Sequence, residues 1–406
     1  MKIIHCADLH LDSGLQTHLS REKAGMRRNE LLSNFGRLAD YASQNGVEII
    51  LIAGDLFDRD KVSALTGNMV LSVIAAHPEI RFYYLRGNHD TGDCLRRQTG
   101  GQSFDKKAVI PENLFLFGSR WKTYAEGEDG RIAIAGIELT GENSAAAHAS
   151  LRLDPDCFNI VMLHGQIYSG EIYSGGVSGS GEPAVPGCGL LKKGGSGGKP
   201  AGAGNAGTIS LRALRGKEID YLALGHIHSW KKDKLDGRGI YCYPGCLEGR
   251  GFDESGEHGF ALLEIDEWNR LRSHRFIPFA RRILYNLEVD VSGCSTTARM
   301  TEKITDRIRG EGCSPKDMAD ITLTGELDVE CEKDTDYIAS ALSGMFFFAR
   351  LRDRTRLRID IKAYLHDESL RGEFVRKVLG DASVPEKEKT EVIRLGFMAM
   401  DGEELP

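Results

Sequence analysis

Five short polar motifs, each at or just after a strand-like apolar run, constrain this chain more than any other feature. They lie in the first 228 residues, in the order Asp8-Leu9-His10, Gly54-Asp55, Gly87-Asn88-His89-Asp90, His164-Gly165 and Gly225-His226-Ile227-His228. Residues two apart near a strand end point to the same side. Ligands of open α/β sheets collect beyond the carboxyl ends of the strands. The pattern therefore predicts that distant segments meet at one site.

The donor atoms of these motifs predict a site for divalent metal ions. They comprise three oxygen donors and four imidazoles, from Asp8, Asp55, Asn88, His10, His164, His226 and His228. Two ions that share one bridging carboxylate need about this many protein groups and still keep water bound. Carboxylate, amide and imidazole donors without thiolate favour manganese, with iron, zinc or magnesium as alternatives. A single Asp after a strand is usually a turn residue, so the inference depends on the ordered set.

The order of strand-like and helix-like segments predicts an α/β (α+β) fold. A helix is expected over residues 20–45, with its buried stripe at Leu31, Phe35, Leu38 and Ala42, and a second helix is expected over 61–76. Strands are expected at 2–7, 47–53, 81–85, 114–117, 132–137, 159–163, 221–224, 239–243, 260–265 and 271–276. This much strand with helices between the early ones predicts two packed sheets, a β-sandwich flanked by helices.

No metal motif follows Pro278, where we expect a domain boundary. Residues 1–278 would form the first domain, and 279–406 a smaller α+β domain that acts as a cap contacting DNA or a partner. Residues 170–207 contain 14 glycines and predict a flexible insertion in the first domain. We interpret this insertion as a solvated surface loop in preference to a lid.

Alternating arginines in the second domain have two interpretations. Arg350, Arg352, Arg354, Arg356 and Arg358 share one parity, so a single strand would place all of them on one face. That face either contacts phosphates or is an exposed sheet face that a turn near Asp353 interrupts. We favour the second interpretation, because a basic face by itself identifies no ligand.

Composition bounds the class of protein. Of the 406 residues, 41% are hydrophobic and 27% are charged, and no apolar stretch has membrane-spanning length. The net charge of −7 argues against nucleic-acid binding through an overall basic surface. The amino terminus enters a strand without a signal-peptide pattern, so a cytoplasmic location is expected. Nine irregularly spaced cysteines do not predict a disulfide framework.

With the motifs assembled, residues 1–275 resemble the calcineurin-like metallophosphoesterase superfamily. Within it, the chain is similar to the SbcD-type bacterial DNA repair exonucleases. The narrower resemblance rests on the segments 5–12 (HCADLHLD), 53–58 (AGDLFD), 86–90 (RGNHD), 220–228 (DYLALGHIH), 243–245 (YPG) and 248–250 (EGR). Two features depart from the family. The glycine-rich insertion is long, and Arg59 after Asp58 resembles the protein serine/threonine phosphatases, although Asp60 then replaces their glycine.

The resemblance implies a role for each motif residue. One ion would be held by Asp8, His10, Asp55 and His228, and the other by Asp55, Asn88, His164 and His226. His89 would be catalytic, off the metals, and would protonate the leaving oxygen or stabilise the charged transition state. Asp58 or Asp90 would orient His89, unless either simply caps a loop. Arg250 and Glu254 either contact substrate or form a salt bridge with each other.

The leading expectation is a manganese-dependent DNA exonuclease of DNA repair, also active as a single-strand endonuclease, that hydrolyses phosphodiesters by a two-metal mechanism. The resemblance implies DNA, a second copy of the chain in a homodimer, and an SbcC-type coiled-coil ATPase as partners. This chain has no Walker A pattern, so any ATP dependence would come from that partner. The alternatives are a phosphoesterase for small nucleotides or phosphoproteins, and a non-enzymatic scaffold on the same fold.

Overall fold

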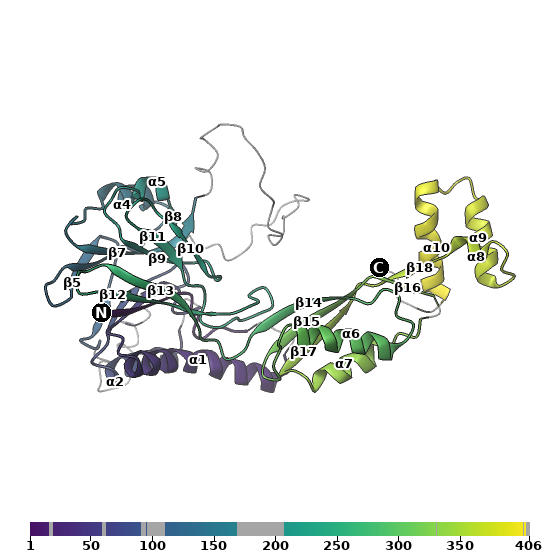
Figure 1. The fold of residues 1–406 in the computed structure, drawn as a ribbon, viewed down its shortest axis with the longest axis horizontal. Coiled ribbons are helices and arrows are strands. Elements are labelled where there is room, and N and C mark those ends of the chain that lie inside the picture. Colours follow the sequence, from purple (N-terminus) through teal and green to yellow (C-terminus); the bar gives the residue numbers. More distant parts are fainter. Residues whose placement is uncertain are drawn as a thin grey trace. The chain divides into compact units, whose positions relative to one another are not determined.

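The computed structural model describes residues 1–15, 19–58, 62–90, 95, 110–168, 207–329, 331–400 and 402. Apart from Gly207, the expected insertion 170–207 lies outside the described residues, as do Arg59 and Asp60. The chain divides into two compact units, Met1–Arg281 and Arg282–Pro406, near the boundary expected after residue 278 (Figure 1). No helix within the described ranges is both long and apolar enough to cross a bilayer.

The first unit stacks two mixed sheets between helices (Figure 1). In the described residues, one sheet has the order β13 (Leu271–Pro278), β12 (Gly259–Ile265), β1 (Lys2–Cys6), β2 (Ile49–Ala53), β3 (Arg81–Leu85) and β4 (Leu114–Leu116). The other has β10 (Lys231–Lys234), β11 (Ile240–Tyr243), β9 (Tyr221–Gly225), β7 (Phe158–Ile167), β6 (Ile132–Gly136) and β5 (Lys122–Glu126), with β8 (Gly207–Ile209) beside β7.

Helices cover the outer faces of both sheets. The first sheet packs against α1 (Arg21–Gln44) and α2 (Ala64–Ala76), and the second against α4 (Ser144–Ser150) and α5 (Leu211–Leu214). A third core lies between the two sheets. The expected fold class, a two-sheet sandwich flanked by helices, is confirmed.

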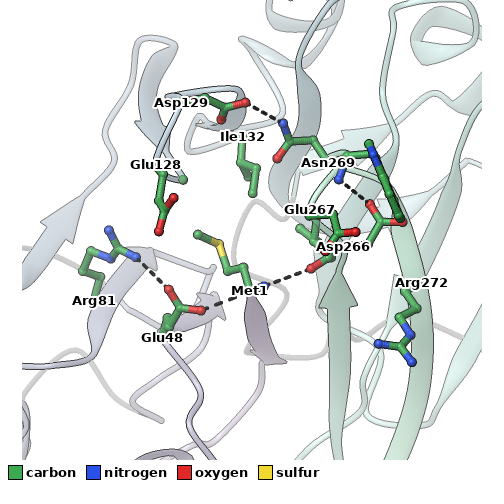
Figure 2. A pocket seen from close by; sticks show the side chains of 13 residues that line it. Met1, Glu48, Arg81, Glu128, Asp129, Ile132, Asp266, Glu267, Asn269 and Arg272 are labelled. Carbon is green, nitrogen blue, oxygen red and sulfur yellow. Dashed lines mark hydrogen bonds and ion pairs between the residues drawn. The ribbon is translucent and has the colours of Figure 1, made fainter.

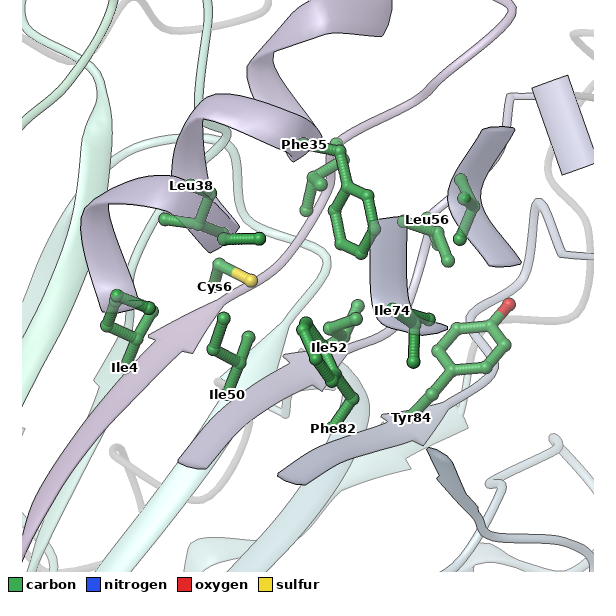
Figure 3. Packing of buried hydrophobic residues seen from close by; sticks show 14 of the residues in the cluster. Ile4, Cys6, Phe35, Leu38, Ile50, Ile52, Leu56, Ile74, Phe82 and Tyr84 are labelled. Carbon is green, nitrogen blue, oxygen red and sulfur yellow. The ribbon is translucent and has the colours of Figure 1, made fainter. Parts of the chain in front are cut away.

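Helix α1 shows how local sequence sets an element and its packing. The Ser20 hydroxyl accepts a hydrogen bond from Lys23 N at 3.3 Å and caps the first turn. Gly46, with a φ of 63°, follows the last turn. The expected stripe is buried: Leu31, Phe35, Leu38 and Ala42. Figure 3 shows Phe35 and Leu38 above side chains of the first sheet.

The core between the sheets contains a buried polar chain. His5 Nδ1 lies 2.8 Å from Tyr221 Oη, which lies 3.2 Å from His274 Nε2. Burial lowers the pKa of His5 to about 3 and that of His274 to about 4. Both imidazoles are therefore neutral in the folded protein at pH 7, whereas histidine in an unfolded chain has a pKa of about 6.5.

This difference predicts acid sensitivity of the first unit. Below pH ~6.5 His5 binds a proton in the unfolded state but stays neutral in the folded state. The contribution of neutral His5 to the stability is therefore complete above that pH and is lost as pH falls. As pH falls below ~6.5, the free energy of unfolding should drop more steeply in the wild type than in His5→Gln, by a difference that approaches about 1.4 kcal/mol per pH unit near pH 5. Denaturant titrations of the chelator-treated proteins between pH 7 and pH 5 measure this difference. Equal pH slopes for the two proteins would contradict it.

The second unit is a smaller α+β structure. Its parallel sheet consists of β14 (Leu284–Asp290), β15 (Met318–Thr324) and β17 (Phe348–Asp353). The helices α6 (Thr297–Gly310) and α7 (Thr335–Ser343) pack with one face of this sheet. The remaining elements are β16 (Glu326–Asp328), β18 (Arg356–Arg358), α8 (Ile361–Tyr364), α9 (Leu370–Gly380) and α10 (Glu386–Met400).

The alternating arginines do not form one stripe. Strand β17 ends at Asp353 and Arg354 lies between strands. Arg356 and Arg358 belong to β18, which pairs with β16 in a separate sheet. Arg350 and Arg352 both pair with the buried Asp320, and Arg358 pairs with Asp328. The structure thus matches the interrupted sheet face and gives no support to a continuous phosphate-contacting stripe.

Candidate metal centre

The loops after β1 and β2 run side by side and carry the first two motifs. Asp8 N donates to Gly54 O at 3.0 Å, and His10 N donates to Asp55 O at 3.0 Å. The parallel pairing of the strands therefore continues into the loops. Asp8, His10 and Asp55 have positive φ values of 52°, 45° and 50°. Such left-handed conformations are costly for residues other than glycine and cluster at functional sites.

The third motif is tied to the second by two carboxylates. Asp90 accepts hydrogen bonds from the backbone N–H groups of Leu56, Phe57 and Gly87 at 3.2, 2.8 and 3.0 Å. Asp55 Oδ1 accepts one from His89 N at 2.8 Å. Burial, followed by the nearby Asp55 carboxylate, raises the pKa of Asp90. Asp90 thus caps a loop, the alternative that we gave for it, and the structure gives no evidence that it orients His89.

The last two motifs belong to the second sheet, at a point where its strands come very close to the end of β2. A Cβ on Gly54, whose φ is 91°, would lie 2.1 Å from His164 Nδ1, and one on Gly225 would lie 1.9 Å from Ala53 O. These two positions therefore require glycine. His164 lies inside β7, which continues to Ile167. The strand that we expected over 159–163 therefore extends past His164, which does not follow it.

The side chains of these motifs converge. Within the described residues, three groups have potential ligand atoms within 4.8 Å of one another: Asp8, His10 and His228; Asp55, His164 and His226; and His10, Asp58 and His89. Asp55, a member of the second group, also lies near the first, because its Oδ2 is 3.3 Å from His164 Nε2 and 3.9 Å from His10 Nε2. We call the first group the His10–His228 position and the second the His164–His226 position.

The two remaining expected residues lie beside these positions. Asn88 Oδ1 is 3.0 Å from His164 Nε2 and 3.1 Å from His226 Nδ1. The His89 ring centroid lies 5.0 Å from that of His10. Folding therefore brings all the expected site residues to one rim of the first unit. Their roles as ligands and as catalyst remain predictions.

The spacing of the donors suits divalent cations. His10 Nε2 and His228 Nε2 face each other at 3.2 Å. Two donors bound at about 2.1 Å and at right angles to one cation are about 3 Å apart. Without metal, one ring can donate an N–H to the other across this distance, and with both of these nitrogens deprotonated the same pair can bind one cation. The donor set at each position is therefore chemically and geometrically suited to a divalent metal ion.

The carboxylates and imidazoles shift one another's pKa. Burial lowers the pKa of His164, but the Asp55 carboxylate outweighs burial and raises it to about 9. Burial raises the pKa of Asp55, yet His164 and His10 hold it well below its usual range. Without metal, a proton on the imidazole thus balances the buried carboxylate. Metal ions must displace such protons, so binding should weaken as pH falls.

The sequence profile of the calcineurin-like phosphoesterase family matches residues 1–230. This chain belongs to that family. Membership implies a hydrolase of phosphate esters that binds divalent metal ions, and the converging side chains supply candidate ligands for them. The identity of the metal does not follow from membership.

Two curated relatives are similar to this phosphoesterase. The uncharacterized metallophosphoesterase YhaO of Bacillus subtilis (strain 168) is 28% identical over 278 residues, which are 65% of this chain and only 57% of YhaO. The DNA double-strand break repair protein Mre11 of Methanopyrus kandleri is 24% identical over 363 residues, 81% of this chain and 69% of that protein. Among solved structures, TT1561 of Thermus thermophilus matches 68% of this chain and 98% of its own, with 12% identity and a TM-score of 0.39.

Two contacts to imidazoles of the centre were not predicted from the sequence. Glu254 Oε1 lies 2.6 Å from Nδ1 of His228. The salt bridge between Arg250 and Glu254, one of our two alternatives, is present at 2.7 Å. Asp58, which we considered as a partner of His89, lies 3.0 Å from His10 Nδ1 and within 4.8 Å of a ring nitrogen of His89. No spacing in the sequence signals the contacts of Glu254 with His228 and of Asp58 with His10.

A hollow of about 1030 Å³ lies at the opposite ends of the parallel strands (Figure 2). It is lined by the start of β1 at Met1, the start of β3 at Arg81 and the turn between β12 and β13. Its carboxylates are partly paired, because Glu48 contacts Arg81 at 3.8 Å and Asp129 accepts a hydrogen bond from Asn269 at 3.0 Å. No group of candidate metal ligands occurs there among the residues described, so this hollow is separate from the metal centre.

Proposed function

We propose that this phosphoesterase is a divalent-metal-dependent DNA exonuclease of DNA repair, which also cleaves single-stranded DNA internally. The similarity to Mre11 carries the proposal. That alignment covers 81% of the chain, more than the first unit, Met1–Arg281, can account for. It therefore includes part of the second unit, which a phosphoesterase domain for small substrates does not require. Manganese is the proposed metal, and DNA, a second copy of the chain and a coiled-coil ATPase are the proposed partners.

The residues of the centre support this chemistry. When bound, two divalent ions would neutralise the phosphodiester and make water a stronger nucleophile. Asp55 would be shared between them, because its Oδ2 lies near imidazoles of both groups. His89 is held through its backbone N–H by Asp55 Oδ1, with its ring beside His10. From there it would give a proton to the leaving sugar oxygen.

The test compares substrates and variants on the manganese-loaded protein. We expect degradation of end-labelled single- and double-stranded DNA that stops with a chelator, and little hydrolysis of cyclic nucleotides or a phosphopeptide. Asp55→Asn should lose both metal and activity. His89→Asn should keep its metal and lose about 10²–10⁴-fold in rate, whereas His366→Asn, at an exposed position in the second unit, should match the wild type.

Two outcomes would overturn the proposal. Hydrolysis of the small substrates alone would assign the chain to the phosphoesterases for nucleotides or phosphoproteins. Full metal occupancy without hydrolysis of any substrate would favour a non-enzymatic scaffold.

A further inference from the structure

Each imidazole of the His10–His228 position has a carboxylate at its Nδ1, while the two Nε2 atoms face each other. Glu254 Oε1 lies 2.6 Å from His228 Nδ1, and Asp58 Oδ1 lies 3.0 Å from His10 Nδ1. Arg250 Nη2 also lies 3.3 Å from His228 Nδ1, but the Glu254 carboxylate is much closer and, when ionised, only accepts hydrogen bonds. We therefore place the hydrogen of the His228 ring on Nδ1. The lone pair is then on Nε2, the atom that faces His10 Nε2. The His10 contact is an ion pair without an aligned hydrogen bond, so the ring hydrogen is assigned for His228 alone.

A single arginine binds both carboxylates. Arg250 donates from Nη1 to Asp58 Oδ1 at 2.9 Å and from Nη2 to Glu254 Oε1 at 2.7 Å. Its backbone N–H donates to Glu254 Oε2 at 2.8 Å. The side chains of Arg250, Asp58 and Glu254 are only 21%, 19% and 7% exposed. Ion pairs this sheltered are weakly screened by salt and hold a fixed geometry.

The His164–His226 position is held in a different way. His164 Nδ1 contacts a backbone carbonyl, Ala53 O, at 2.9 Å. His226 turns its Nδ1 toward Asn88 Oδ1 at 3.1 Å, inside the candidate centre itself. In the described part of the chain, no hydrogen bond or ion pair joins either imidazole to Asp58, Arg250 or Glu254. The two positions therefore depend on different groups for their shape.

We propose that Asp58, Arg250 and Glu254, here called the clamp, are positioning residues that set the affinity of the His10–His228 position for its metal ion. The His164–His226 position does not depend on the clamp. The inference rests on the proposed function only in requiring that both positions bind metal. Groups that orient metal-binding imidazoles typically contribute about 10–100-fold to metal affinity.

Replacement of Arg250 distinguishes two ways in which this residue could affect metal affinity: by positioning the ligands, or by its charge alone. Arg250→Ala removes a cation close to the His10–His228 position and leaves the two carboxylates with their imidazole contacts but without the arginine that joins them. If charge alone mattered, binding of a divalent cation would become tighter. If the clamp positions the imidazoles, the freed carboxylates and His228 lose their fixed arrangement and binding becomes weaker. The sign of the change in affinity therefore decides between the two explanations.

The experiment titrates the chelator-treated full chain with Mn²⁺ alone, following free Mn²⁺ by electron paramagnetic resonance and heat by calorimetry. The wild type should bind two equivalents. Glu254→Ala and Arg250→Ala should each weaken one equivalent by about 10–100-fold and leave the other within about threefold. Glu254→Gln keeps an acceptor for His228 Nδ1, so its affinity should be intermediate. Arg238→Ala is the matched control, because Arg238 pairs with Asp220 and Glu218 away from the centre.

The outcomes distinguish this inference from the proposed function. Tighter binding by Arg250→Ala, equal weakening of both equivalents, or unchanged affinities in Arg250→Ala and Glu254→Gln would overturn the clamp. If the wild type binds two Mn²⁺ and the variants change affinity as expected, but no DNA is hydrolysed, the proposed function would be wrong and the role of the clamp would still hold. Fewer than two equivalents in the wild type would overturn both. If Glu254→Ala fails to fold, the isosteric Glu254→Gln still decides.

Discussion

Replacing Gly87 with alanine is expected to abolish most of the metal-dependent activity. A Cβ at this position would lie 2.1 Å from Asp55 Oδ1 and 2.6 Å from Asp55 N. Either the loop or the Asp55 carboxylate must move, and Asp55 is the group that both metal positions would share. A displacement of about 1 Å at a reacting centre costs on the order of 10²-fold in rate. We therefore expect a loss of at least about 100-fold in kcat and weaker binding of both Mn²⁺ ions.

The measurement combines turnover of the best substrate with Mn²⁺ titration. Gly237→Ala is the matched control, because a Cβ there has open space around it, and it should behave as the wild type. Circular dichroism should show both variants folded, since the change at Gly87 is confined to loops at the end of the strands. Full activity and two bound Mn²⁺ in Gly87→Ala would mean that Asp55 does not hold the metals.

Replacing Arg27 with methionine is expected to destabilise the first unit by about 3–5 kcal/mol. Arg27 is 1% exposed, and its guanidinium donates to Glu248 Oε1 at 3.0 Å and to Gly249 O at 2.7 Å. Glu248 also accepts hydrogen bonds from Asn34 Nδ2 at 2.9 Å and from Arg281 N at 2.8 Å. Loss of the arginine would remove the buried cation that donates to this carboxylate, which costs far more than the lost contact itself.

Tryptophan fluorescence during denaturant unfolding measures this effect selectively, because Trp121, Trp230 and Trp268, the three tryptophans of the chain, belong to the first unit. Arg299→Ala removes the largely exposed ion pair with Glu302 in the second unit and should leave this transition unchanged. Adding Glu248→Gln to Arg27→Met should recover part of the loss, because the buried side chain that lost its arginine is then neutral. A loss below about 1 kcal/mol in Arg27→Met, typical of surface pairs, would contradict the prediction.

Local pattern was sufficient to predict most of the elements. Residues only a few positions apart determine these elements. Examples are the buried stripe and Ser20 cap of α1 and the apolar runs of β2, β3 and β12. Strand β10 escaped prediction because its sequence, Lys-Lys-Asp-Lys, is exposed throughout and has no apolar alternation. It is a strand because it pairs with β11 at the edge of the sheet.

The amino-acid sequence by itself determined the order of the five motifs, the donor atoms that they offer and the elements that carry them, because these depend on residue type and short-range periodicity. Only the tertiary structure decided which side chains contact the candidate ligands and fix their orientation. Glu254 reaches His228, Asp58 reaches His10, and Arg27 in α1 reaches Glu248, 221 positions later. Contacts of this kind follow no spacing rule, because they depend on how two sheets and a helix pack. The packing places a charged side chain where another buried charge requires a partner.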